Sequence, residues 1–207
     1  MIAQQDWTGN KPAIFACHGA SNHSERDRAE LDYYATDPRV VEMLLCKEQF
    51  HANIWEPAVG GGHIAEVLEK NGHVCFCSDI VDRGYPCTYE IDFLTEKFDR
   101  PWGGDIITNP PYKYAKEFVL KAMDVLKDGY KLAMFLKLTF LESKKRKELF
   151  DKYPPKKIYV MRDRYDCALN GDFSGKAGKA VCYAWFVWEK GYCGLPEIDW
   201  LDGEIDG

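Results

Sequence analysis

The sequence predicts an α/β protein built on an open, mostly parallel sheet of seven strands with helices on both faces. Three observations lead to this fold class. Short apolar segments typical of strands alternate with segments of helical periodicity. A glycine-rich turn joins the first of these strands to a helix, and no internal repeat interrupts the pattern. At 207 residues, 46% of them hydrophobic, the chain can bury a sizeable core as one domain.

Each element is predicted from its own periodicity. Residues 39–50 carry apolar side chains at helical spacing, with Asp37 as the expected N-cap and Pro38 at the first helical position. Gly72 is expected to close the helix that follows the glycine-rich turn. The remaining helices are expected at 63–72, 114–126 and 142–153, and the strands at 52–57, 73–80, 88–93, 105–109, 130–138, 157–161 and 181–189.

Composition divides the chain into three regions. Residues 1–32 are polar and are expected to form an arm, 33–192 carry the α/β pattern, and 193–207 form an acidic tail. No stretch approaches the roughly 18 to 20 apolar residues of a membrane span, and the first residues lack the features of a signal peptide. We therefore expect a cytoplasmic protein without a membrane partner.

The charge is distributed unevenly. The net charge is −6, yet Lys137 to Arg164 contains ten basic and four acidic residues, so the rest of the chain carries −12. Such asymmetry allows a globally acidic protein to bind phosphates on one surface. Ordinary lysines on a solvated helix face would give the same pattern, and both interpretations stay open.

The eight cysteines do not predict a disulfide framework, because the chain is too long to need one. Cys75, Cys77, Cys167 and Cys182 lie in or beside apolar strand-like segments and are expected to be reduced and buried. No C-x-x-C pair accompanies them, so no metal site is expected.

A glycine loop predicts a nucleoside site. Residues 56–65, EPAVGGGHIA, follow a strand and open a helix, and from Gly60 they fit the pattern G-x-G-x-x-A. Asp79 ends the next strand, nineteen residues after Gly60, where a carboxylate can accept hydrogen bonds from both ribose hydroxyls. The alternative is a glycine-rich turn followed by an acidic loop residue.

Glu56 favours a cationic ligand. It ends the first strand, where its charge would repel the pyrophosphate of a dinucleotide but attract the ammonium and sulfonium of S-adenosylmethionine. Asp92, in the next strand, could accept a hydrogen bond from an adenine amino group, with Phe93 against the ring. Glu56 could instead be an exposed strand-end carboxylate, Asp92 a helix cap and Phe93 a core residue.

The segment TNPPY at 108–112 ends a strand on a rigid turn. Proline fixes φ and lacks an N–H, so Asn109 is expected to precede a rigid turn. By itself, the motif could be no more than a turn with an aromatic residue. With this motif, over about residues 33–190, the chain resembles the S-adenosylmethionine-dependent N6-adenine DNA methyltransferases of Rossmann-like class I fold. The segments ATDPRVVEML, EPAVGGG, SDI, DFL and NPPY occur in that family's order. GASNHS, YYATDP and AWFVWEKG resemble its small phage and prophage form.

The resemblance implies roles for the motif residues. Asn109 and the Pro110 carbonyl would accept hydrogen bonds from the target amine, Pro111 would stiffen the turn, and Tyr112 would stack on a flipped base. Thr36 and Asp37 would lie near the methionine end of the cofactor, with a helix cap as the alternative. The predicted cofactor-binding residues are Thr36, Asp37, Glu56, Ala58, Gly60, Gly62, Asp79, Ile80, Asp92, Phe93 and Asn109.

The expected activity is methyl transfer from S-adenosylmethionine to adenine N6 in DNA. Residues 142–180, a basic helix followed by a glycine-rich loop, are expected to recognise the substrate. The alternative for the loop is a variable surface loop without a role in recognition. The expected nucleic-acid-binding residues are Lys144, Lys145, Arg146, Lys176 and Lys179. The alternatives are the same chemistry on RNA or on a protein glutamine amide, a nucleotide-binding oxidoreductase, and a catalytically silent nucleic-acid-binding module.

Overall fold

The computed structural model describes residues 34–165, 168–169 and 181–203. The expected arm at 1–32 and the loop residues Lys176 and Lys179 lie outside the described residues. No helix in the described part of the chain has the length and apolar character that a membrane span requires.

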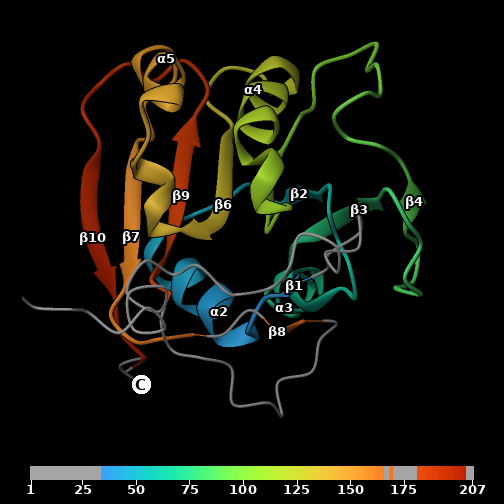
Figure 1. Ribbon diagram of the computed structural model, residues 1–207. Coiled ribbons are helices and arrows are strands. Elements are labelled where there is room, and N and C mark those ends of the chain that lie inside the picture. The colour runs from blue at the N-terminus through green and yellow to red at the C-terminus, as the bar shows by residue number, and fades with distance from the viewer. Residues whose placement is uncertain (1–33, 166–167, 170–180, 204–207) are drawn as a thin grey trace, which may run out of the picture. The chain divides into compact units, whose positions relative to one another are not determined.

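One sheet of eight strands forms the centre of the fold (Figure 1). Its order is β10-β7-β9-β6-β5-β2-β3-β4. The strands are β2 Asn53–Glu56, β3 Val74–Asp79, β4 Tyr89–Glu90, β5 Asp105–Thr108, β6 Lys131–Lys137, β7 Lys157–Met161, β9 Tyr183–Glu189 and β10 Glu197–Leu201. Strands β2 to β6 pair in parallel, whereas β9 runs antiparallel to both β6 and β7. The mostly parallel α/β fold expected from the sequence is therefore confirmed.

The eighth strand comes from the segment that was expected to be an acidic tail. β10 pairs in parallel with β7, and its last residue, Leu201, is 1% exposed. The alternation of acidic and apolar residues here is a strand pattern, which the high charge of the segment obscures.

Helices cover both faces of the sheet, as expected. They are α2 Pro38–Lys47, α3 His63–Lys70, α4 Ala115–Val125 and α5 Lys147–Lys152. Figure 1 shows α4 and α5 at one side of the sheet and α2 and α3 at the other. The core divides in the same way, since neighbouring strand residues such as Ile106 and Ile107 belong to separate apolar clusters.

The predicted ends of two helices are confirmed. The carboxylate of Asp37 accepts a hydrogen bond from the Arg39 N–H at 3.0 Å and caps α2, with Pro38 as its first residue. Gly72 follows α3 with a φ of 86°.

The basic helix expected at 142–153 is wrong as a single element. A 3₁₀ turn at Lys144–Arg146 precedes α5, and Ser143, with a φ of 117°, caps the turn by accepting a hydrogen bond from the Lys145 N–H. The strand expected at 88–93 is also shorter, because only Tyr89–Glu90 pairs with β3.

The six cysteines among the described residues are free. Cys77 is buried as expected, Cys75 and Cys182 are half-buried, and Cys167 lies outside the described residues. Burial raises the pKa of the Cys75 thiol to about 12, which keeps it protonated.

Candidate active site at the carboxyl edge of the sheet

The candidate site lies where the parallel strands end. Glu56, Asp79 and Asn109 stand at or just after the last residues of β2, β3 and β5. Parallel neighbours end at the same edge of a sheet, and ligands of open α/β sheets bind beyond that edge. The fold therefore brings together three polar residues that lie far apart in the sequence.

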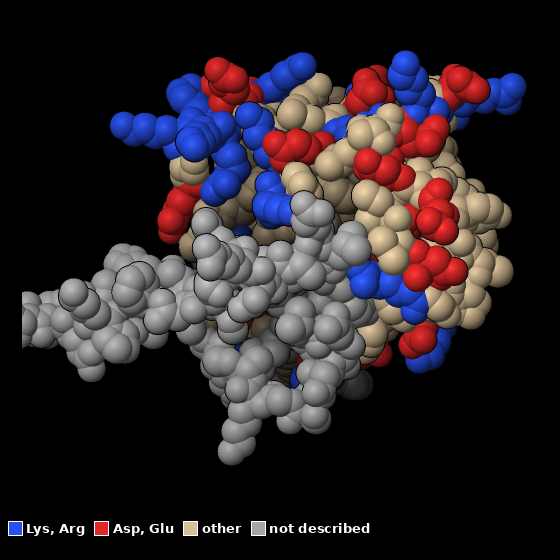
Figure 2. Space-filling model, turned by 45° about the vertical axis from the view of Figure 1, so that its right-hand side comes forward, with Lys and Arg blue, Asp and Glu red and all other residues tan. Residues whose placement is uncertain are grey.

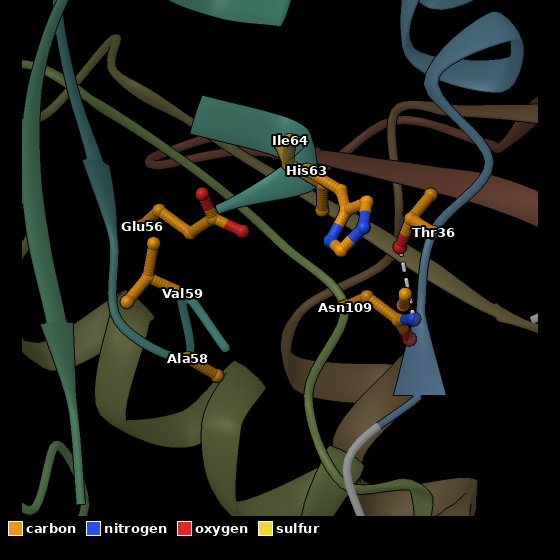
Figure 3. Close-up of a pocket in the computed structure, with 8 residues that line it drawn as sticks. Thr36, Glu56, Ala58, Val59, His63, Ile64 and Asn109 are labelled. Carbon is orange, nitrogen blue, oxygen red and sulfur yellow. Dashed lines mark hydrogen bonds between the residues drawn. The ribbon is translucent and has the colours of Figure 1, made fainter. Parts of the chain in front are cut away.

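A small pocket opens at this edge and contains four of the residues predicted to bind a cofactor. It is partly open to solvent and is lined by Ala35, Thr36, Glu56, Ala58, Val59, His63, Ile64 and Asn109. Figure 3 shows Glu56 on one side, Thr36 and Asn109 on the other, and the His63 ring between them.

Glu56 is a buried carboxyl group that the protein leaves incompletely satisfied. It is 1% exposed, and its Oε2 accepts no hydrogen bond from the described residues. Burial raises the pKa of this carboxyl well above its ordinary value, a hydrogen bond from the Ala65 backbone opposes that shift, and the charge of Asp79 adds to it. A buried acceptor of this kind suits a cationic or N–H-bearing ligand.

The glycine loop is fixed by Asp79. The Gly60 N–H donates to Asp79 Oδ2 at 2.8 Å, and the Val81 N–H donates to Asp79 Oδ1 at 3.2 Å. Each carboxylate oxygen can accept further hydrogen bonds, so Asp79 keeps the capacity for ribose hydroxyls that the sequence predicts.

Gly62 must be glycine for two reasons. Its φ is 86°, and a Cβ atom there would lie 1.9 Å from the Tyr85 ring. Tyr85 thus packs directly against the backbone at the start of α3 and holds the loop closed on that side.

Thr36 and Asn109 are hydrogen-bonded to each other on the side of the pocket opposite Glu56. Asn109 Nδ2 donates to Thr36 Oγ1 at 3.0 Å, and Thr36 is 2% exposed. The adjacent Asp37 does not line this pocket, because its carboxylate caps α2 and pairs with Arg39 at 2.5 Å. The helix-cap alternative therefore describes what Asp37 does here.

Three further predicted cofactor-binding residues, Ile80 and the two expected around an adenine ring, Asp92 and Phe93, do not line this pocket. Ile80 is 55% exposed and offers an apolar side chain. Asp92 stabilises a turn by accepting hydrogen bonds from the Leu94 N–H at 3.0 Å and the Thr95 hydroxyl at 2.8 Å. Phe93 is 2% exposed with its ring in the core, so the core alternative replaces the expected stacking of its ring on a ligand.

The prolines of the NPPY motif hold the next turn. Pro110 is buried, and the Pro111 carbonyl accepts a hydrogen bond from the Tyr114 N–H at 2.9 Å to start a 3₁₀ turn at Tyr112–Tyr114. Tyr112 lines a second hollow, and Lys137 Nζ lies 5.2 Å from the centre of its ring. The other residues of this hollow are Ala115, Leu136, Lys137, Thr139, Phe140 and Arg146.

The three predicted nucleic-acid-binding residues that the structure describes are of two kinds. Lys144 and Lys145 are exposed, whereas the Arg146 guanidinium donates to the carbonyls of Thr139 and Phe140 at 3.0 and 2.7 Å. Arg146 therefore braces the turn and has less freedom to bind a phosphate than the two lysines. Figure 2 shows lysine and arginine side chains gathered at the upper left, beside a hollow in the surface.

Sequence reasoning missed two residues at this edge. His63 lines the first pocket and Lys137 the second hollow, although neither was given a role of its own. Both positions carried a signal, because His63 is the first helical residue after the glycine loop and Lys137 ends a parallel strand.

Comparisons with known proteins support the fold. No protein-family model matches the sequence, and no curated protein does. Among solved structures, a type I restriction-modification methyltransferase subunit from Streptococcus thermophilus is similar with a TM-score of 0.60 at 13% identity, over 79% of this chain and 46% of that one. A predicted O-methyltransferase from Agrobacterium tumefaciens is similar with a TM-score of 0.58 at 12% identity, over 80% of this chain and 86% of that one. A candidate RNA methyltransferase from Pyrococcus horikoshii is similar with a TM-score of 0.53 at 12% identity, over 87% of this chain and 99% of that one.

These similarities define the class of fold. The chain has the Rossmann-like architecture of the class I methyltransferases, with one additional strand, β10, beyond the seven that were expected. At 12 to 13% identity the similarity concerns the fold alone.

Proposed function

We propose that this protein is an S-adenosylmethionine-dependent methyltransferase that methylates the exocyclic N6 amine of adenine in DNA. The observation that carries the proposal is the meeting of Asn109 and Glu56 in one pocket at the carboxyl edge of the sheet. Asn109 is the first residue of the NPPY motif, and Glu56 is a buried carboxyl group whose Oε2 has no hydrogen-bond partner among the described residues.

The residues present fit the cofactor. Its ammonium can donate to the unsatisfied Oε2 of Glu56, and its ribose hydroxyls can donate to Asp79. Ile80 provides an exposed apolar surface suited to adenine. When bound, S-adenosylmethionine supplies an electrophilic methyl group. A nicotinamide dinucleotide fits less well, because the strand-end carboxyl of Glu56 would stand beside its pyrophosphate.

Asn109 and Pro110 would act on the target amine. The lone pair of an exocyclic amine is delocalised into the adenine ring, so the amine is a weak nucleophile. Two acceptors held by the prolines, Asn109 Oδ1 and the Pro110 carbonyl, would draw this nitrogen toward tetrahedral geometry and free the lone pair. Positioning and electrostatics then supply the catalysis.

Tyr112 and its surroundings support a nucleic acid substrate. The Tyr112 ring lines the hollow beside the motif, and Lys137 lies over it. An aromatic ring next to a cation suits a base and its phosphate. The exposed Lys144 and Lys145 add positive charge nearby.

The direct test is to offer the purified chain labelled S-adenosylmethionine with DNA, RNA and glutamine-containing protein, and to analyse the methylated products by mass. We expect N6-methyladenine from DNA. Methylated RNA adenine or methylglutamine would correct the substrate, and no transfer to any acceptor would contradict the proposal.

A substitution identifies the motif residue. Asn109→Ala should lower methyl transfer by at least about 100-fold, or roughly 2.7 kcal/mol, while cofactor affinity changes little. The matched control is Asn53→Ala, at the exposed opposite end of β2, which should retain full activity. Equal activity of the Asn109 variant and the wild type would remove Asn109 from the mechanism.

A further inference from the structure

The hydrogen bond between Asn109 and Thr36 joins two segments that lie 73 residues apart in the sequence. Asn109 Nδ2 is the donor and Thr36 Oγ1 the acceptor, at 3.0 Å. The same bond is drawn in Figure 3, where both side chains face the pocket from the side opposite Glu56. Since Thr36 is 2% exposed, its hydroxyl is shielded from water that would otherwise compete for the amide.

Both partners sit on rigid backbone. Ala35, the residue before Thr36, pairs with Ala168 in a two-residue antiparallel ladder formed by β1 (Tyr34–Ala35) and β8 (Ala168–Leu169). The residue after Thr36 is the N-cap of α2. Asn109 is held between the last residue of β5 and Pro110. The bond therefore connects two fixed points, so it can define the rotation of the Asn109 side chain.

The orientation of this amide decides what the substrate meets. An asparagine side chain carries a donor and an acceptor at opposite ends of one planar group. With Nδ2 turned toward Thr36, Oδ1 is the end that remains to accept a hydrogen bond. Rotation by half a turn would bring the Asn109 NH₂ against the NH₂ of the target, two donors facing each other.

We propose that Thr36 is a positioning residue that holds the amide of Asn109 with its oxygen toward the methyl acceptor. This inference rests on the proposed function. It differs from the role expected from the sequence, in which Thr36 lies near the methionine end of the cofactor. A positioning residue affects turnover, whereas a cofactor contact affects binding.

The structure provides an internal control for the hydroxyl. Thr108 is fully buried in β5 beside Asn109, and its Oγ1 has no hydrogen-bond partner among the described residues. Replacing either threonine by valine removes one hydroxyl at nearly constant volume. Only the change at Thr36 also removes a hydrogen-bond partner of Asn109.

The test compares Thr36→Val, Thr36→Ser and Thr108→Val for turnover on DNA and for S-adenosylmethionine affinity by calorimetry. Thr36→Val should lower kcat roughly 10-fold, the effect of one lost hydrogen bond, and leave the cofactor Kd within about threefold. Thr36→Ser should restore kcat to within about threefold of the wild type, and Thr108→Val should leave it unchanged.

Three results would overturn the inference. Equal losses in Thr36→Val and Thr36→Ser would show that the methyl group matters for packing. A weaker cofactor Kd at unchanged kcat would assign Thr36 to the cofactor. Unchanged kinetics in Thr36→Val would show that the hydroxyl has no role. If Thr36→Val does not fold, as judged by circular dichroism, Thr36→Ala takes its place.

Failure of the proposed function would look different, because the wild type itself would then transfer no methyl group to any acceptor. The bond can still be tested by denaturant unfolding of Thr36→Val, Asn109→Ala and the double variant. Non-additive shifts of the unfolding midpoint would show that Thr36 holds the Asn109 side chain. Additive shifts would overturn the positioning inference as well.

Discussion

Two buried glutamates, at opposite edges of the sheet, show how differently this fold treats a carboxyl group. At the amino edge, Glu48 accepts hydrogen bonds from Lys131 at 2.5 Å and from the Tyr159 hydroxyl at 2.8 Å, and Lys157 lies 3.3 Å away. At the carboxyl edge, Glu56 has one oxygen without a partner among the described residues. The first group is satisfied by the protein alone, whereas the second is suited to a partner from outside.

The pKa values of these two groups shift in opposite directions. Burial raises the pKa of Glu48, but the hydrogen bonds and charges of its partners outweigh it and lower the pKa overall. Burial raises the pKa of Glu56, and the opposing hydrogen bond from the Ala65 backbone does not reverse the shift. Since perturbed carboxyl groups concentrate at functional sites, the contrast supports the proposed role of Glu56 in cofactor binding.

Removal of Glu48 should give the largest loss of stability. Glu48→Ala leaves Lys131 without its carboxylate partner at a site where Glu48 is 8% exposed, and we expect unfolding to become easier by about 3 to 5 kcal/mol. Denaturant unfolding measures the change, with the exposed Glu42→Ala on α2 as control. S-adenosylmethionine affinity should stay near the wild-type value, and a selective loss of affinity would contradict the contrast.

Substitution of Glu56 should have the opposite effect on stability. Glu56→Gln removes a carboxyl group whose charged form is disfavoured by burial, so the ligand-free protein should become more stable at neutral pH. The same change should weaken S-adenosylmethionine binding about 100-fold, or roughly 2.7 kcal/mol. Calorimetry checks both results, with Glu66→Gln, exposed on the first turn of α3, as control.

The dependence on pH follows from the sign of the shift. Because the folded protein binds the Glu56 proton more tightly than the unfolded chain, stability falls as pH rises above the unfolded pKa of about 4.3 and levels off above the folded pKa. The stabilisation by Glu56→Gln should therefore be small near pH 4 and grow toward neutral pH. A constant difference across this range would show that Glu56 is charged in the folded protein.

The exposed basic residues should give the smallest effect. Lys144→Ala combined with Lys145→Ala should weaken DNA binding several-fold and reduce the salt slope by about 2, since each phosphate contact contributes roughly 0.9. A matched double variant at two exposed lysines, Lys70 at the end of α3 and Lys127 two residues after α4, should leave binding unchanged. Titrations at several salt concentrations measure the DNA affinity and the salt slope of each double variant. Equal losses in the two variants would indicate a general contribution of positive charge.

Local patterns predicted the parts of the molecule that depend on local chemistry. The cap of α2 by Asp37, the end of α3 before Gly72 and the glycine loop each need only a few neighbouring residues. The order of strands and helices is set by periodicity in the same way. The placement of Glu56 and Asn109 at one edge then follows from parallel pairing.

Long-range contacts decided the parts that the sequence left open. Phe93 could have faced a ligand or the core, and its ring packs against that of Trp55 in β2, with 5.1 Å between the ring centres. The expected basic helix is interrupted because Arg146 donates to backbone carbonyls of the preceding turn. The bond from Asn109 to Thr36 likewise has no trace in the spacing of either motif.

The position of β10 has a consequence for the exposed edge of the sheet. Without it β7 would be an edge strand, and unpaired edges recruit strands from other chains. β10 is the edge strand instead, and its residues Ile198 and Trp200 are 56% and 47% exposed. Glu197 and Asp199 alternate with these apolar residues, so two copies of the strand placed side by side would repel each other. The acidic side chains of this segment therefore disfavour edge-to-edge pairing of two copies of β10.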